Sequence, residues 1–262
     1  MALLSILLLS GGNAIAAPSA ADLQAFNDAG ARLLALIKDA ESARKADALR
    51  TPEAKNLIQR LSDESRMLNG LPYAATNLGT IIDICEVVNR ASVSLMLFDA
   101  KEQIDPKANP EQTSAALVPL MQRNILQFQN ELKELQPFLL RCLAKQIPAI
   151  SEFIASLKPE EITEVRRNGL ARMRFGVLQV FGGAFNAVND EQYKPDYRLA
   201  LLSALAETAD VFVTITQLSV RKQMADAAAE SARRANPPYK AHLERVSVIF
   251  RDQSCGILCS IQ

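Results

Sequence analysis

Residues 75–99, ATNLGTIIDICEVVNRASVSLMLFD, decide the fold class of this chain. Drawn as a helix, the segment is apolar on most sides, which is typical of a helix buried inside a bundle. Its three charged residues, Asp83, Glu86 and Arg90, exclude a helix that spans a membrane. The segment therefore predicts an interior helix of a helical protein.

The rest of the chain has the same helical character. No segment alternates apolar and polar residues for long enough to indicate a strand. Helix-start signals, in which a proline follows a capping or loop residue and precedes an acid, recur along the chain. They lie at 51–53, 109–111, 158–160 and 194–196. We therefore expect an all-α bundle of about seven to eight helices, mostly antiparallel.

Prolines divide the second half of the chain. Pro119 lies well inside a helical pattern and predicts a kink, whereas Pro137 predicts a break between two helices. A single long helix is expected over residues 195–235, because no strong breaker interrupts it before Asn236 and the two prolines that follow.

The first sixteen residues have the order of a secretory signal peptide. An apolar run over residues 2–9 leads into small residues that end in Ala14-Ile15-Ala16, an A-x-A cleavage pattern. The run is shorter than the roughly 20 residues of a membrane-spanning helix. We expect cleavage after residue 16 and one all-helical domain over residues 17–262. The alternatives are a buried N-terminal helix and, for residues 17–70, a separate helical arm.

The composition excludes some classes of partner. The chain has 29 basic and 29 acidic side chains, so it lacks the basic excess that is typical of nucleic-acid-binding proteins. Tryptophan is absent, which disfavours a carbohydrate-binding surface. No Asn-x-Ser/Thr sequence occurs, and this fits a bacterial periplasmic or secreted protein better than a eukaryotic secretory one.

Four cysteines, Cys85, Cys142, Cys255 and Cys259, predict two disulfides if the chain is exported. The alternative is four reduced thiols in a cytoplasmic protein. If the chain turns back at Pro137, Cys85 and Cys142 come to a similar level in the bundle, whereas a straight helix would separate them. We therefore predict the pairs Cys85–Cys142 and Cys255–Cys259.

Catalytic and cofactor motifs are missing from the sequence. The single histidine, His242, would have to serve any Ser-His or Cys-His site, and no phosphate-binding glycine loop or metal-ligand spacing occurs. The sequence therefore favours a non-enzymatic protein without a cofactor or metal.

Glycines recur every seven residues at Gly169, Gly176 and Gly183, which predicts a strip without side chains along one helix face. The favoured interpretation is close approach of a neighbouring helix. The alternative is a groove for an apolar ligand rimmed by phenylalanines. These are Phe175, Phe181 and Phe185.

Arg172 lies close to the glycine face at 100° per residue. A buried arginine needs an acidic partner, and Asp83 and Asp210 are the candidates because both are set among apolar residues. A structural ion pair is favoured over a ligand-binding charge cluster.

These observations favour an exported helical bundle that binds a partner protein or acts as an envelope scaffold. The second hypothesis is a periplasmic binder of a small apolar ligand beside the glycine strip. An inter-helix cavity of several hundred cubic ångströms, lined by the phenylalanines, would support that second hypothesis.

Overall fold

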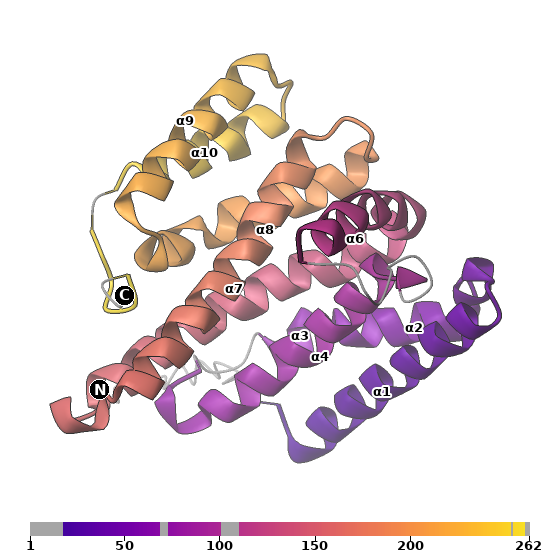
Figure 1. The fold of residues 1–262 in the computed structure, drawn as a ribbon, viewed down its shortest axis with the longest axis horizontal. Coiled ribbons are helices and arrows are strands. Elements are labelled where there is room, and N and C mark those ends of the chain that lie inside the picture. The colour runs from indigo at the N-terminus through magenta and orange to yellow at the C-terminus, as the bar shows by residue number, and fades with distance from the viewer. Residues whose placement is uncertain (1–17, 69–72, 101–109, 253, 260–262) are drawn as a thin grey trace, which may run out of the picture.

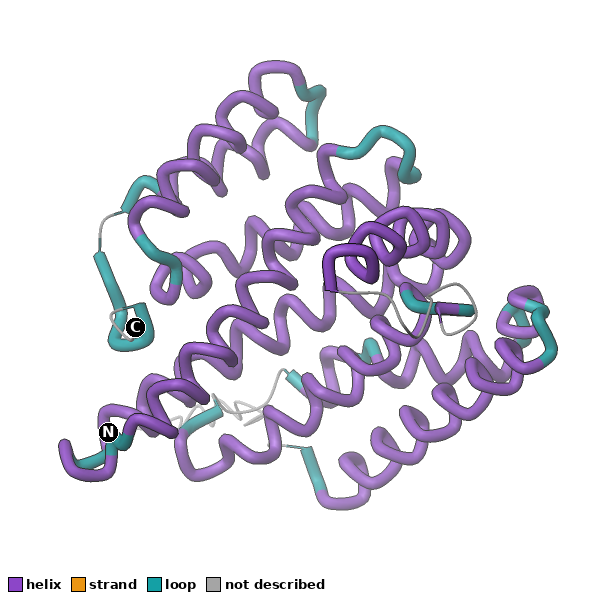
Figure 2. The backbone as a smooth tube through the Cα atoms, viewed as in Figure 1, coloured by secondary structure: helices purple, strands orange, loops and turns teal. Residues whose placement is uncertain are grey.

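The computed structural model describes residues 18–68, 73–100, 110–252 and 254–259, so the expected signal peptide lies outside the described residues. Within them the chain forms helices and no strand, with eight α-helices of ten residues or more, which confirms the all-α bundle (Figures 1 and 2). The α-helices are α1 (Ala20–Ser42), α2 (Pro52–Leu61), α3 (Glu64–Met67), α4 (Leu78–Met96), α6 (Pro110–Ser156), α7 (Glu164–Asn189), α8 (Pro195–Phe212), α9 (Leu218–Arg234) and α10 (Tyr239–Phe250). Short 3-10 helices span Ala46–Leu49, Ala75–Asn77, Pro159–Glu161 and Val213–Ile215.

Helix α4 is the interior helix that its sequence predicts. It packs against α1 on one side and against α6 on another. Ile81, Ile84 and Val88 are at most 1% exposed, so the apolar face is removed from water almost completely. Burying each such side chain stabilises the fold by about 1.5–3 kcal/mol.

Helix α1 begins at a capping box. The backbone N–H of Asp22 donates to the Ser19 hydroxyl oxygen (3.1 Å), and the Ser19 N–H donates to the Asp22 carboxylate (3.2 Å). The ring of Phe26 lies 6.3 Å from that of Phe138 in α6. The N-terminal helices thus share a hydrophobic core with the rest of the bundle.

Helix α6 changes direction at Phe128, not at Pro137. It continues through Pro119, Pro137 and Pro148, and within it Phe128 has non-helical backbone angles (φ −109°, ψ 19°). The two halves run in different directions (Figure 1). The predicted break at Pro137 is therefore wrong. The bend occurs where the buried Phe128 ring packs edge-on against Phe98, at 5.3 Å.

The prediction of a single helix over residues 195–235 is also wrong, because this segment forms two helices, α8 and α9. The break follows a run of β-branched residues, which lose side-chain freedom in a helix. The hydroxyls of Thr214 and Thr216 donate to the carbonyls of Val211 (2.6 Å) and Phe212 (2.7 Å). As a result α9 turns away from α8 and pairs with α10 (Figure 1).

The two halves of α7 differ in burial. No described residue of 164–176 is buried, whereas six residues of the C-terminal half are. In that half the ring of Phe181 lies 4.5 Å from Phe212 and 5.4 Å from Phe250. Helix α7 is therefore anchored to the bundle through its C-terminal half.

Candidate functional site

A cavity of about 750 Å³ lies between α4, α6 and α7. Its walls are mostly aliphatic, with Leu139, Leu140 and Leu143 on α6 and Val177 and Val180 on α7. The volume falls within the range of about 300–1,000 Å³ that is typical of small-molecule sites. This is the described feature that best matches a binding site.

Two of the three glycines of the strip face this cavity, and Gly169 does not. Gly176 and Gly183 line it, and a Cβ atom built on either would meet no atom within 4 Å. The predicted close approach of another helix is therefore wrong, and the glycines leave open space instead. Glu86, Gln179 and Gly183 line the cavity and are exposed, so it opens to solvent between α4 and α7.

The phenylalanines expected at the rim do not line the cavity. Phe181 and Phe185 are 0% and 6% exposed and belong to the buried core, while Phe175 is 63% exposed. Helical geometry explains the error, because these residues lie on other faces of α7 than the two glycines. Three of the six methionines line the cavity instead. They are Met96, Met121 and Met173. Methionine side chains are flexible and adapt to irregular apolar partners.

A polar cluster lies at one part of the cavity wall. The hydroxyl of Tyr197, in α8, donates to Gln136 Oε1 (2.6 Å), and Gln136 Nε2 donates to the thioether sulfur of Met96 (3.4 Å). Burial raises the pKa of the Tyr197 hydroxyl, so this group stays neutral. Because a thioether is a weak acceptor, the Gln136 NH₂ group retains hydrogen-bond donor capacity.

One further polar group of the cavity wall is buried without a partner among the described residues. Ser92 is 1% exposed, and among the described residues its hydroxyl has no hydrogen-bond partner. Gln146 also lines the cavity and is 7% exposed. An unsatisfied buried polar group costs about 1–3 kcal/mol. A ligand with hydrogen-bonding atoms would recover that cost.

The disulfide Cys85–Cys142 joins α4 to α6 beside the cavity, with Cα atoms 5.6 Å apart. The predicted pairing is confirmed, but its stated reason is wrong, because the chain does not turn at Pro137. The bend at Phe128 instead lets the second half of α6 run alongside α4. The bond holds two walls of the cavity together.

The predicted buried ion pair of Arg172 is wrong. Arg172, Asp83 and Asp210 are all exposed, and no ion pair links Arg172 to either carboxylate. Arg172 belongs to the half of α7 that has no buried residue, so its charge remains solvated. Arg172 does not line the cavity and has no assigned role in it.

A different arginine is buried, and no sequence pattern pointed to it. Arg221 in α9 is 1% exposed. Its Nε donates to the Thr216 carbonyl (2.7 Å), and its Nη1 donates to the carbonyls of Asp252 (2.9 Å) and Ser254. Burial lowers the pKa of the Arg221 guanidinium, although the Asp252 charge opposes this. Backbone carbonyls therefore take the place of the acidic partner expected for a buried arginine.

The C-terminal tail lies beside Arg221 and is held there by further bonds. The predicted disulfide Cys255–Cys259 is confirmed, with Cα atoms 5.7 Å apart. The Gly256 N–H donates to the Thr214 carbonyl (3.0 Å), and a Cβ at this glycine would lie 2.9 Å from that oxygen. Arg174 of α7 donates to the carbonyls of Leu258 (2.9 Å) and Cys259 (3.0 Å). These bonds fasten the tail to α7 and to the turn after α8.

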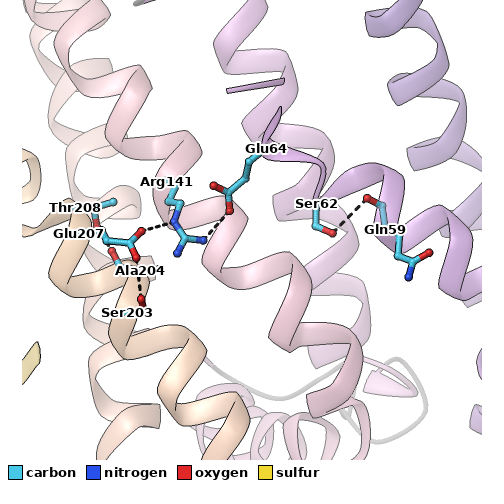
Figure 3. Close-up of polar contacts among 8 residues, drawn as sticks. All are labelled: Gln59, Ser62, Glu64, Arg141, Ser203, Ala204, Glu207 and Thr208. Carbon is cyan, nitrogen blue, oxygen red and sulfur yellow. Dashed lines mark hydrogen bonds and ion pairs between the residues drawn. The ribbon is translucent and has the colours of Figure 1, made fainter. Parts of the chain in front are cut away.

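A charged junction joins three helices on another side of α6 (Figure 3). Arg141 makes 2.7 Å ion pairs with Glu64 of α3 and with Glu207 of α8, and the Ser203 hydroxyl also donates to Glu207 (2.8 Å). Burial acts to raise the pKa of Glu207, but the hydrogen bonds from Arg141 and Ser203 and the Arg141 charge hold it below its usual value. The junction is a structural clamp, because every group in it is already paired.

In the described part of the chain, no group of three or more His, Cys, Asp or Glu side chains is placed to hold a metal ion. Among the described helices, none has the length and apolar character needed to cross a membrane. Comparison of the chain with protein-family models, characterised proteins and solved structures found no match.

Proposed function

We propose that the protein binds a small, largely apolar ligand in the cavity between α4, α6 and α7. The observation that carries this proposal is the open space over Gly176 and Gly183, where the helices stand apart. Helix glycine costs about 1 kcal/mol relative to alanine. No neighbouring helix packs against these glycines, so helix packing does not offset this cost. Binding of a ligand in the open space would offset it.

Filling the cavity tests the proposal. We expect Gly176→Leu and Gly183→Leu to fold normally and to weaken binding of the neutral fluorescent probe N-phenylnaphthylamine by about tenfold or more. The reason is that a new side chain would occupy part of the ligand volume, and a clash of about 1.4–3 kcal/mol corresponds to roughly tenfold or more in affinity.

Gly169→Leu and Gly182→Leu are matched controls, because both glycines are in α7, have open space around them and do not line the cavity. We expect both controls to bind the probe as the unmodified protein does. Absence of probe binding by the unmodified protein, or equal binding by all four variants, would overturn the proposal.

We further propose that the protein works outside the cytoplasm. The sequence of residues 1–16 supports this, and so do two disulfides with no free cysteine among the described residues. Sequencing of the protein from a bacterial host should find Ala17 at or near the N-terminus. An intact Met1 in the cytoplasmic fraction would contradict export.

A protein partner is the second candidate. It is favoured by Phe175, which is 63% exposed on α7, and by Val165, which is 83% exposed on the same helix. If this surface binds a partner, Phe175→Ser should abolish co-purification of a stoichiometric protein from envelope extracts. Unchanged co-purification would exclude Phe175 from the interface.

A further inference from the structure

We infer that the cavity selects an uncharged, elongated amphiphile, with a hydroxyl or carbonyl head group held by Ser92 and Gln136. The inference rests on the proposed function and adds the chemical class of the ligand. Shape, charge and the placement of unsatisfied donors each contribute one part of it.

The cavity is long. On α4 its lining residues run from Ile82 to Met96, which corresponds to about 20 Å along the helix at about 1.5 Å per residue. On α7 they run from Met173 to Ala184, or about 16 Å. A volume of about 750 Å³ spread over this length accommodates an extended hydrocarbon chain better than a globular ligand.

The lining carries almost no charge. Glu86 is the charged residue among the lining side chains, and it is exposed and paired with Arg90 (3.6 Å). No lysine or arginine is among the described lining residues. A carboxylate or phosphate head group would lose its hydration there without gaining an opposite charge, which is costly. The head group is therefore uncharged.

Two of the donors that line the cavity, Ser92 and Gln136, lie near the C-terminal part of α4. Ser92 and Met96 are four residues apart, so they lie on one helix face, and Gln136 contacts the sulfur of Met96. The buried Ser92 hydroxyl has no partner in the described chain, and the Gln136 amide has only a thioether acceptor. An oxygen of the head group accepts from both, while the hydrocarbon chain extends along Leu143 and Val177.

Competition experiments test the charge of the head group. Dodecanol and dodecanoate have the same chain length, and each is titrated against bound N-phenylnaphthylamine at neutral pH. We expect dodecanol to displace the probe at a concentration at least about tenfold lower. Tighter or equal binding of dodecanoate would overturn the inference. The proposed function would survive that result if Gly176→Leu still prevented probe binding.

Paired serine variants test the position of the head group. Ser92→Ala should weaken dodecanol binding about two- to tenfold, the effect of one lost hydrogen bond, and leave the probe affinity unchanged. Ser94→Ala is the matched control, because Ser94 is on α4 but does not line the cavity. An unchanged dodecanol affinity in Ser92→Ala, or a loss seen only in Gln146→Leu, would overturn this placement.

Discussion

The region of the C-terminal tail and the cavity wall each hold a buried polar group, and only the first is hydrogen-bonded within the described chain. In the tail region, the buried guanidinium of Arg221 donates to three backbone carbonyls. In the cavity, the equally buried hydroxyl of Ser92 has no partner within the described chain. The fold accounts for a satisfied buried group, whereas an unsatisfied one requires another explanation, such as a bound water, ion or ligand. The comparison therefore separates a structural region from a binding region.

Glycine shows the same contrast. A Cβ at Gly256 would lie 2.9 Å from the Thr214 carbonyl oxygen, so the tail requires glycine there for close contact. A Cβ at Gly183 would touch nothing within 4 Å. The same residue type thus permits close packing in one region and keeps a space open in the other.

The disulfide of the cavity wall is expected to show the largest effect, and the disulfide of the tail a smaller one. Cys85–Cys142 spans 57 residues and Cys255–Cys259 spans 4. Because longer loops lose more entropy on closure, replacing the first pair by serine should lower the free energy of unfolding by about 4 kcal/mol, and replacing the second by about 2 kcal/mol. Urea unfolding of the two double variants measures this. Equal losses would show that the tail matters as much as the cavity wall.

Removing the satisfied charge of the tail region should have the next largest effect. Arg221→Met leaves several carbonyls without donors and should lower the free energy of unfolding by about 3 kcal/mol. Lys222→Met is the control, because Lys222 is exposed beside it, and should change stability by less than about 0.5 kcal/mol. A small effect at Arg221 would contradict the structural role that the comparison gives to this region.

The Arg141 junction should give the smallest effect, and it depends on pH. The pKa of Glu207 is lowered in the folded protein, so its ion pair contributes stability above the unfolded pKa of about 4.3 and loses it as the pH falls through the folded value. Because Glu207 is half-exposed, Glu207→Gln should cost at most about 1 kcal/mol near neutral pH and nothing in strong acid.

Urea titrations at several pH values, with Glu134→Gln as an exposed control, measure this difference. A cost that persists in strong acid would show that Glu207 acts through packing instead of charge.

The fold class could be predicted from the sequence because α4 is apolar on most sides and charged at only a few positions. The positions at which the helices bend or end could not be predicted from the sequence. Pro137 is tolerated inside α6, while Phe128, which carries no breaker signal, bends it where its ring enters the core. Bends of this kind depend on tertiary contacts with segments such as Phe98, and these are not encoded in the local pattern.

The candidate site was predicted in part. The seven-residue spacing of Gly176 and Gly183 identified the face of α7 that lines the cavity, but the choice between contact and open space depends on how far α4 lies from α7. The buried arginine was assigned to Arg172 because this residue lies close to the glycine face of its helix. Arg221 is buried instead, because the tail folds over it, and a contact across 33 residues has no local signal.

The uneven anchoring of α7 has a consequence for motion. Its N-terminal half contributes Met173 and Gly176 to the cavity wall, yet none of the described residues 164–176 is buried. Segments with few buried contacts open locally at low free-energy cost, so backbone amides there should exchange with deuterium sooner than those of residues 177–188. If the cavity binds a ligand as proposed, we expect the ligand to enter through this wall and to slow its exchange when bound.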